Sequence, residues 1–241
     1  MIASLPMYDW PELLTATDAF WQGLAGHMRQ AGLAPPASLS HAPDHKAAWR
    51  MPDFFFSQTC GYPFTHEFKG QLALIGTPEY DAEGCAGPLY CSFIFARNAK
   101  PRVAAINDDD SMSGMLALRL FAGDFAETHI TGGHLRSLQA LQDGVADICA
   151  IDAVCVALAR QHRPQLLEGL KLLGTSPKVP ALPFVTSLAR AADVPAMREA
   201  LQACMADPSL SQAREALKLK GFRITSTSDY DRILELEGGL P

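Results

Sequence analysis

The chain has 241 residues, of which 48% are hydrophobic and 19% are charged, and its formal net charge is −6 at pH 7. A chain of this length and apolar content can bury one large core or two lobes of roughly 100 residues each. The acidic balance and the lack of a basic stripe argue against a nucleic-acid partner, because phosphate backbones require many Lys and Arg side chains. An anion would have to be held locally, by backbone amides and hydroxyl groups.

The cysteines and the N-terminal segment indicate which cofactors and which cellular compartment to expect. None of the six cysteines falls in a C-x-x-C pair, so the sequence indicates neither a zinc site nor a redox motif, and we expect no metal and no cofactor. The segment after Met1 has no basic region followed by a long apolar run, and no window is long enough to span a membrane. The sequence as given predicts a cytoplasmic protein, or a periplasmic one if the native N-terminus lies upstream.

In the first part of the chain, short strand-like runs alternate with helical runs, which is typical of an α/β fold. Strands are expected at 2–7, 38–40, 53–56, 72–76 and 90–96, and a long helix at about 13–31. Asp44 is placed to cap a short helix containing Trp49. The apolar run 53–56 is typical of a buried parallel strand, and Ser57 and Gln58 would follow it in a loop, where open α/β sheets bind ligands.

The alternation resumes after a polar break at 97–101. Strands are expected at 103–107, 127–131, 146–151 and 170–176, helices between them, and a return strand at 180–186. Further helices are expected from a cap at Asp193, at 209–220 and at 230–236. The pattern indicates two α/β lobes, each a mixed, mostly parallel sheet flanked by helices, joined by two hinge strands with a cleft between them. Lobe 1 comprises 1–95 and 186–241, and lobe 2 comprises 96–185.

The loop Ser111-Met112-Ser113-Gly114 is the most informative motif, because it opens the apolar helix that follows the strand at 103–107. The first turn of a helix has N–H groups without partners and a partial positive charge. A serine there either caps the helix or joins those N–H groups in holding an anion. Capping requires one hydroxyl only, so the second hydroxyl at Ser113 favours anion binding.

Other polar residues lie at the ends of expected strands. His134 follows two glycines and precedes a helix, where an imidazole can donate to an oxyanion; the alternative is a surface histidine. Asp152 is expected either to accept from a ligand or to cap the next helix. Tyr8 is expected either to line the cleft or to pack in the core. For His45, binding and structural roles remain equally open, and no residue is predicted to be catalytic.

From residue 2 to about 221, the order of motifs resembles the substrate-binding components of phosphate, phosphite and phosphonate ABC importers, a branch of the type 2 periplasmic binding protein fold. The motifs that carry the resemblance are Ala42-Pro43-Asp44, Asp53–Ser57, Ser111-x-Ser113-Gly114, Gly133-His134, the alternation over 138–147 and the return strand 180–185. The resemblance implies a clamp in which a small oxyanion is held between two lobes. It also implies a permease as a partner.

The resemblance implies roles for the candidate residues. The Ser111 and Ser113 hydroxyls, the first-turn amides and His134 would hold the oxyanion, and Ser57, Gln58 and His45 would close on it from the first lobe. Val154 and Leu182 stand near positions where aminoalkyl phosphonate binders carry carboxylates, so a simpler phosphate- or phosphonate-type ligand is expected. The chain would then serve an ABC-type importer or act as a related soluble sensor. The alternative is a cytoplasmic enzyme on the same fold that makes a thiamine or menaquinone precursor.

Overall fold

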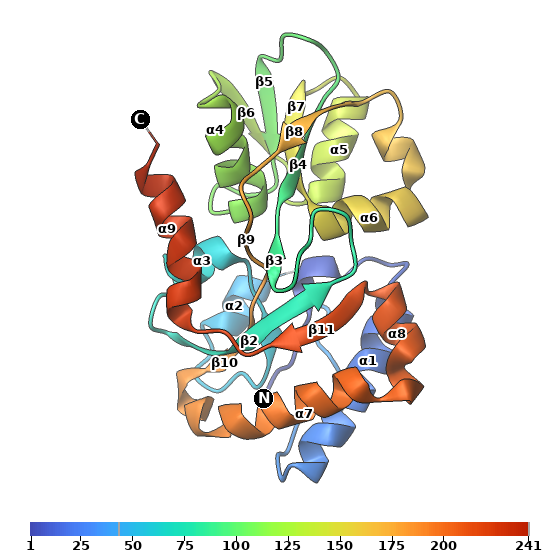
Figure 1. Ribbon diagram of the computed structural model, residues 1–241, viewed down its shortest axis with the longest axis vertical. Helices are drawn as coiled ribbons and strands as arrows, with labels where there is room; N and C mark the ends of the chain where they lie inside the picture. Colours follow the sequence, from blue (N-terminus) through green and yellow to red (C-terminus); the bar gives the residue numbers. More distant parts are fainter. Residues whose placement is uncertain (43, 241) are drawn as a thin grey trace. The chain divides into compact units, whose positions relative to one another are not determined.

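The computed structural model describes residues 1–42 and 44–240, with the side chain of His45 outside the description (Figure 1). The chain divides into two compact units. Unit 1 comprises Met1–Asp81 and Pro180–Tyr230, and unit 2 comprises Ala82–Val179 and Asp231–Pro241. The boundaries expected from the sequence, at 95/96 and 185/186, lie inside elements of single sheets. Strand β4 (Ser92–Ala96) is hydrogen-bonded on both sides within unit 2, which places the division before it.

Unit 1 contains a four-stranded sheet in the order β1-β10-β2-β11. Its strands are β1 (Ser57–Gln58), β10 (Phe184–Ser187), β2 (Leu72–Tyr80) and β11 (Leu219–Arg223). Each neighbouring pair in this order is antiparallel, whereas a mostly parallel sheet was expected. The one parallel contact described here is the bridge between Ala3 and Phe56. The difference arises because the strands come from distant parts of the chain and are not joined by βαβ crossovers.

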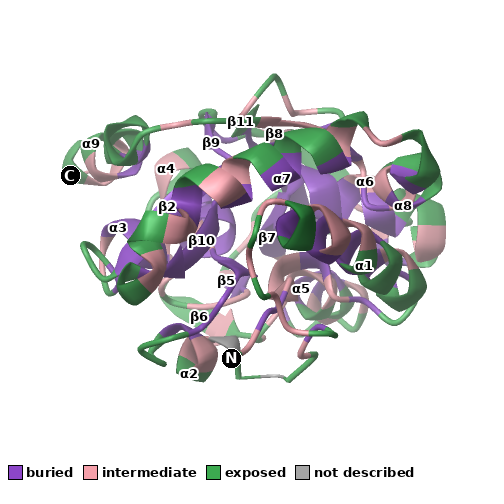
Figure 2. Ribbon diagram, turned by 90° about the horizontal axis from the view of Figure 1, so that it is seen from below, coloured by how far each residue is buried: buried purple, intermediate pink, exposed green. Residues whose placement is uncertain are grey.

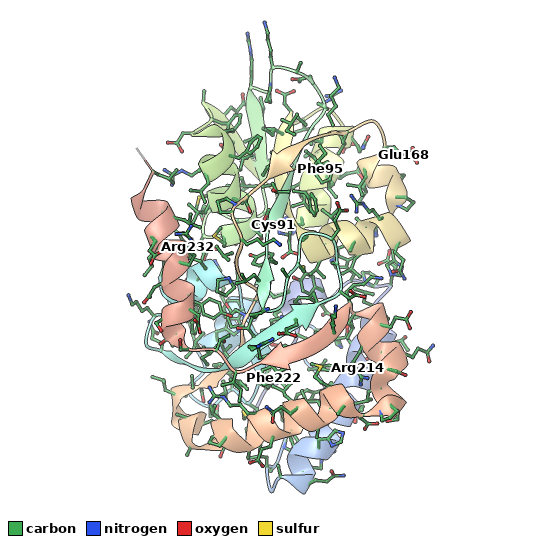
Figure 3. All side chains as sticks on the ribbon, in the orientation of Figure 1. Cys91, Phe95, Glu168, Arg214, Phe222 and Arg232 are labelled. Atoms are coloured by element: carbon green, nitrogen blue, oxygen red, sulfur yellow. The ribbon has the colours of Figure 1, made fainter. Side chains whose placement is uncertain are left out.

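Unit 1 also contains several helices. They are α1 (Leu14–Gln30), α2 (His45–Trp49), α3 (Gly61–Thr65), α7 (Val194–Ala206) and α8 (Ser211–Ala216), with short 3₁₀ turns η1 (Pro6–Tyr8), η4 (Leu188–Asp193), η5 (Pro208–Leu210) and η6 (Thr227–Tyr230). In α1, Phe20, Leu24 and Met28 recur at a four-residue spacing and are fully buried. Phe222 of β11, labelled in Figure 3, packs so closely over Gly76 that a larger residue there would collide with its ring.

Unit 2 contains a five-stranded sheet in the order β6-β5-β7-β4-β8. The strands are β5 (Val103–Ile106), β6 (Glu127–Ile130), β7 (Ile148–Asp152), β4 and β8 (Lys171–Thr175). β5 pairs in parallel with β6 and β7, and β4 pairs antiparallel with β7 and β8. The sheet is mixed, as expected, but it is not mostly parallel, because β4 pairs antiparallel on both of its sides. β7 is buried along its whole length and is drawn in purple in Figure 2.

Helices follow the parallel strands β5, β6 and β7 of unit 2, and further helices complete the unit. They are the one-turn π-helix η2 (Met112–Leu116), which continues into α4 (Ala117–Ala122), then α5 (His134–Gln142), α6 (Ala153–His162), η3 (Pro164–Leu167) and the C-terminal α9 (Asp231–Gly238). The two-residue strand β3 (Leu89–Tyr90) pairs with β9 (Val179–Pro180). The mixed α/β class expected from the sequence is therefore confirmed. Among the described residues, no helix is both long enough and apolar enough to cross a membrane.

Several expected elements differ from those observed. The run 2–7 forms only the Ala3 bridge before Pro6 opens η1, because proline has no N–H for a ladder and favours a first helical turn. No strand forms at 38–40 in the described chain. The expected helix over 209–220 ends at Ala216, and β11 starts at Leu219. Lys218 has φ of 57°, a left-handed conformation that terminates the helix.

The structure confirms the helix cap expected at Asp44 but not the one expected at Asp193. The Asp44 carboxylate accepts a hydrogen bond from the amide of Ala47 at 2.9 Å, as expected for the cap of α2. Asp193 makes no side-chain cap within the described chain and instead forms an ion pair with Arg190 at 2.8 Å. The sequence pattern of a helix does not show that Asp193 pairs with Arg190.

Candidate functional site

Ser111 is the N-cap of the helix that follows β5. Its Oγ accepts a hydrogen bond from the amide of Gly114 at 3.1 Å, and its carbonyl accepts from the amide of Leu116 at 2.9 Å. Ser111, Met112 and Ser113 are all buried. The first turn leaves the amides of Met112 and Ser113 without an intrahelical acceptor, together with the positive end of the helix dipole. The capping role that the sequence left open for Ser111 is thus present in the structure.

Ser113 is joined to His134, which begins α5. Its Oγ lies 2.8 Å from Nε2 of His134 and 3.5 Å from Oγ of Ser111. The two strands that precede these loops, β5 and β6, are parallel neighbours, so their carboxyl ends bring the loops together. The structure therefore places the two serines and His134 in one chain of polar contacts, as the sequence predicted.

The imidazole of His134 is held in its neutral form. Burial lowers its pKa from 6.5 to about 4, because the charged ring would lose its hydration. A hydrogen bond with the backbone of Ala150 opposes part of this lowering of the pKa. A neutral imidazole can either donate or accept at Nε2, so it can orient the Ser113 hydroxyl in either sense.

Gly114 lies very close to the side chain of Asn107, which precedes the same loop. A Cβ at this position would collide with Oδ1 of Asn107, the residue that follows β5. That oxygen is buried and lacks a hydrogen-bond partner within the described chain. Sequence reasoning missed Asn107; its position directly after the strand and before the acidic run is the signal that would have singled it out.

Three carboxylates precede the loop. Oxygens of Asp108, Asp109 and Asp110 lie within 4.8 Å of one another. A hydrogen bond and the charge of Asp108 raise the pKa of Asp109, because two neighbouring carboxylates repel each other. The local charge before Ser111 is therefore negative, and the loop has to rely on neutral donors.

Asp152 is engaged as a helix cap. Its carboxylate is buried and accepts from the amides of Val154 at 2.7 Å and Cys155 at 3.1 Å at the start of α6. The capping alternative given by the sequence is therefore present, and a ligand contact of Asp152 stays a prediction. Val154 is buried and apolar.

Ser57 and Gln58 lie in strand β1 of unit 1, whereas a loop was expected. They pair with Val185 and Phe184 of β10, a partner that cannot be identified from local sequence. The Ser57 Oγ accepts from Nε1 of Trp49 at 2.9 Å and contacts the Ser4 hydroxyl at 2.9 Å. Both residues are buried.

Gln58 and Tyr8 meet at a small cavity in unit 1. The Gln58 amide donates to the Tyr80 hydroxyl at 2.7 Å and to the Leu182 carbonyl at 3.0 Å. The Tyr8 ring packs edge-on against Tyr80, with ring centroids 5.5 Å apart. These three residues line a cavity of about 20 Å³, enough for about one water molecule. Ligand contacts from Ser57, Gln58 and Tyr8 stay predictions, and the His45 side chain lies outside the described residues.

One protein-family model matches residues 99–230, which is more than half of the chain. It describes the periplasmic substrate-binding protein of a phosphonate ABC transporter. The chain belongs to this family. Among curated proteins, no sequence matches it significantly.

Solved structures of similar fold agree with this family. A binding protein component of an ABC phosphonate transporter (PA3383) from Pseudomonas aeruginosa has 17% identity and a TM-score of 0.75, with 98% of this chain and 85% of that chain covered. PhnD1 from Prochlorococcus marinus, in complex with methylphosphonate, has 12% identity and a TM-score of 0.74, with 100% and 97% covered. XAC2383 from Xanthomonas citri, bound to chloride, has 16% identity and a TM-score of 0.75, with 99% and 96% covered.

Membership of the phosphonate-binding family defines the general role of the chain. Such proteins are the substrate-binding components of ABC importers, which implies a small ligand and a permease partner. The expected importer role and the two-lobed type 2 periplasmic binding protein fold are confirmed. The family supports binding without catalysis, and it does not support the enzyme of precursor biosynthesis that was the alternative.

Proposed function

We propose that unit 2 holds the oxyanion of a phosphonate- or phosphate-type ligand at the loop Ser111–Gly114 and His134. The observation that carries this proposal is the hydrogen bond of 2.8 Å between Ser113 and His134, beside the capped start of η2. Capping alone accounts for Ser111 but not for a second buried hydroxyl tied to a neutral imidazole. The family assignment supports a ligand of this chemistry.

The donors of the proposed site are neutral. The amides of Met112 and Ser113 and the Ser111 hydroxyl can each donate to an oxygen of the ligand, and the Ser113 hydroxyl can do so when Nε2 of His134 donates to it. Hydrogen bonds to a charged acceptor contribute about 1.5–3 kcal/mol each, so a few of them suffice for micromolar binding. Repulsion from Asp108–Asp110 opposes part of this energy.

The remainder of the ligand is proposed to carry no amine. Val154 and Leu182, near the positions of carboxylates in aminoalkyl phosphonate binders, are apolar and buried. Asp152, the nearest acid to Val154 in sequence, accepts from two backbone amides. Methylphosphonate, the ligand of the Prochlorococcus protein, is therefore a suitable first probe.

We further propose that the chain works in the periplasm and delivers its ligand to an ABC permease. The family description supports both statements, because it names a periplasmic component of a transporter.

Isothermal titration with methylphosphonate and inorganic phosphate tests the proposed site. The double variant Ser111→Ala/Ser113→Ala should lose measurable affinity, because two hydroxyl donors are removed from the loop. The matched control is Ser226→Ala/Ser228→Ala, which removes an exposed pair of hydroxyls 2.8 Å apart and should leave the affinity unchanged. Unchanged affinity in the Ser111/Ser113 variant would contradict the proposal.

A further inference from the structure

The chain passes between unit 1 and unit 2 at three places, at 81/82, 179/180 and 230/231. The sequence predicts two hinge strands, and the crossing at 230/231 is a third connection. In a two-lobed protein, the residues at such crossings absorb the changes of backbone angle when the lobes close. The contacts that hold the ends of the connecting segments therefore determine how the hinge bends.

The hydroxyl group of Tyr230 bonds to the segments that lead to the other two crossings. Tyr230 is the last residue of unit 1 before the third crossing, and its hydroxyl donates to the carbonyl of Ala181 at 2.7 Å, just after the second crossing. Its oxygen also lies 2.7 Å from Oγ1 of Thr77 on β2, the strand that ends at Tyr80 before the first crossing. Since the Tyr230 hydrogen is used on Ala181, Thr77 donates to Tyr230.

These contacts lie in the core of unit 1. Thr77 and Tyr230 are fully buried, and Ala181 is 1% exposed. Burial raises the pKa of Tyr230, so its hydroxyl keeps its proton and remains a donor. The ring of Tyr230 packs edge-on against Phe64, with ring centroids 5.1 Å apart. Core packing accounts for this ring, but it does not require the hydroxyl.

Gln58 makes a second connection between β2 and the return segment. Its amide donates to the Tyr80 hydroxyl at 2.7 Å and to the carbonyl of Leu182, the residue after Ala181, at 3.0 Å. Two buried side chains thus join the end of β2 to adjacent carbonyl groups of the return segment. Tyr230 adds the third segment, because it belongs to that segment itself.

We propose that Tyr230 is a positioning residue for ligand binding, whose hydroxyl fixes the unit 1 ends of the three connecting segments relative to one another. Bending is then confined to a few residues at the crossings, and less conformational freedom is lost when a ligand orders the protein. This inference rests on the proposed function, because it concerns the affinity for that ligand, and it adds a residue outside the anion-binding loop.

The variant Tyr230→Phe tests the inference, because it removes the hydroxyl and retains the ring. The affinity for methylphosphonate, measured by isothermal titration, should fall about tenfold. Hydrogen exchange without ligand, measured by mass spectrometry, should become about fivefold faster at 82–85, 176–179 and 231–234, on the unit 2 side of each crossing. Thr77→Val should have the same effects, and Thr77→Ser, which retains the hydroxyl, should restore the wild-type values.

The control variant is Thr186→Val, which removes a buried hydroxyl of β10 that donates to the carbonyl of Phe55 at 2.8 Å. Both Thr186→Val and Tyr230→Phe should lower the melting temperature by about 2–4 °C, but Thr186→Val should leave the affinity and the exchange of the three segments unchanged. Wild-type affinity in Tyr230→Phe, or equally accelerated exchange of these segments in Thr186→Val, would overturn the inference. Failure of the wild-type protein to bind any phosphorus oxyacid would instead overturn the proposed function, and the exchange data would then decide the role of Tyr230.

Discussion

The Ser113 hydroxyl lies 2.8 Å from Nε2 of His134, although 21 residues separate the two in sequence. The relationship results from the pairing of β5 with β6, since each strand leads directly into the loop that carries one of the two residues. Neither residue is charged at neutral pH, and the first helical turn beside them has unpaired amides. A small anion is the partner that this combination favours.

Ser111 should contribute to stability as well as to binding, because its hydroxyl caps η2. Ser111→Ala should lower the free energy of unfolding by about 1 kcal/mol, measured by urea denaturation. Ser111→Thr retains the capping oxygen and should restore most of this loss, together with measurable methylphosphonate binding. A fully stable Ser111→Ala protein would show that the cap contributes nothing.

A side chain at residue 114 should be unfavourable, because its Cβ would collide with Oδ1 of Asn107 unless that side chain moves. Gly114→Ala should destabilise the protein by about 1–3 kcal/mol, as overpacking of a buried site does. The double variant Asn107→Ala/Gly114→Ala should recover part of the loss. Gly26→Ala is the matched control: its Cβ meets nothing within 4 Å, so the helix α1 should gain stability by up to about 1 kcal/mol.

His134 should make the protein less stable in acid. The unfolded chain binds a proton with a pKa of 6.5, whereas burial lowers the pKa of the folded imidazole to about 4. The unfolded state therefore binds more protons between these values, and stability should fall as the pH decreases from 6.5 to about 4. His134→Gln should show a smaller decline in this window when denaturation midpoints are compared. An NMR titration that gave a pKa at or above 6.5 for His134 would contradict this prediction.

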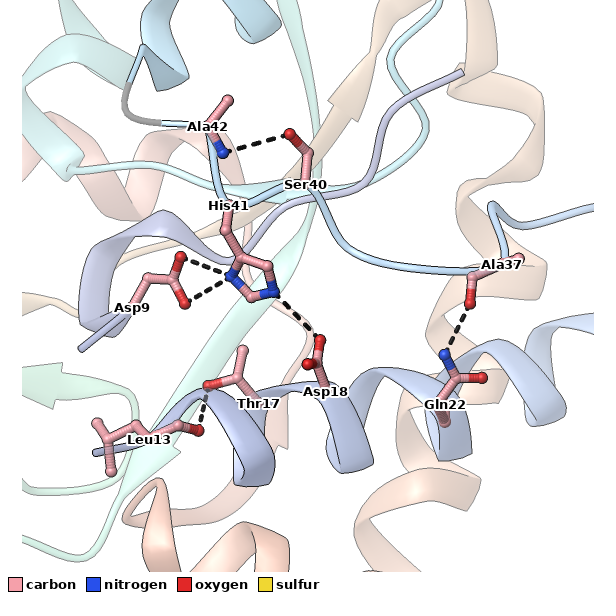
Figure 4. A network of polar contacts seen from close by, with 9 residues as sticks. All are labelled: Asp9, Leu13, Thr17, Asp18, Gln22, Ala37, Ser40, His41 and Ala42. Atoms are coloured by element: carbon pink, nitrogen blue, oxygen red, sulfur yellow. Dashed lines mark hydrogen bonds and ion pairs between the residues drawn. The ribbon is translucent and has the colours of Figure 1, made fainter. Parts of the chain in front are cut away.

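His41 in unit 1 should have the opposite effect. Its Nδ1 lies 2.7 Å from an oxygen of Asp9, and its Nε2 lies 3.2 Å from an oxygen of Asp18 on α1 (Figure 4). The hydrogen bond to Asp9, more than that to Asp18, raises the pKa of His41 above 6.5. The folded state then holds the proton more strongly, so the stabilisation is complete below pH 6.5 and is lost as the pH rises through the raised value.

The variant His41→Gln tests this linkage. Its melting temperature should lie further below that of the wild type in mildly acidic buffer than in alkaline buffer, because only the protonated ring pairs with both carboxylates. Asp9→Asn should weaken the effect more than Asp18→Asn. A stability difference that is independent of pH would show that the pairs contribute no charge interaction.

The sequence predicted the parts of the fold that depend on local chemistry. The caps at Asp44, Ser111 and Asp152 were all recognisable, because a short polar side chain before a helical run satisfies first-turn amides. The approach of His134 to Ser113 was also predictable, since loops after neighbouring parallel strands lie at one edge of a sheet.

The other features were not predicted because they depend on contacts that a local sequence pattern does not show. Strand β1 has two residues, Ser57 and Gln58, and exists only because β10, more than 120 residues later, pairs with it. The first two residues of strand β11 were assigned to a helix, because the left-handed turn at Lys218 has no glycine to signal it. Asn107 was overlooked for a similar reason, since its contact with Gly114 depends on how the loop folds back.

The most direct test of the central claim is an amide NMR titration of the protein with methylphosphonate. If the oxyanion binds at the start of η2, the largest shifts should occur at the amides of Met112, Ser113 and Gly114 and at the ring of His134. Saturating shifts confined to other parts of the chain, with these signals unmoved, would contradict the account.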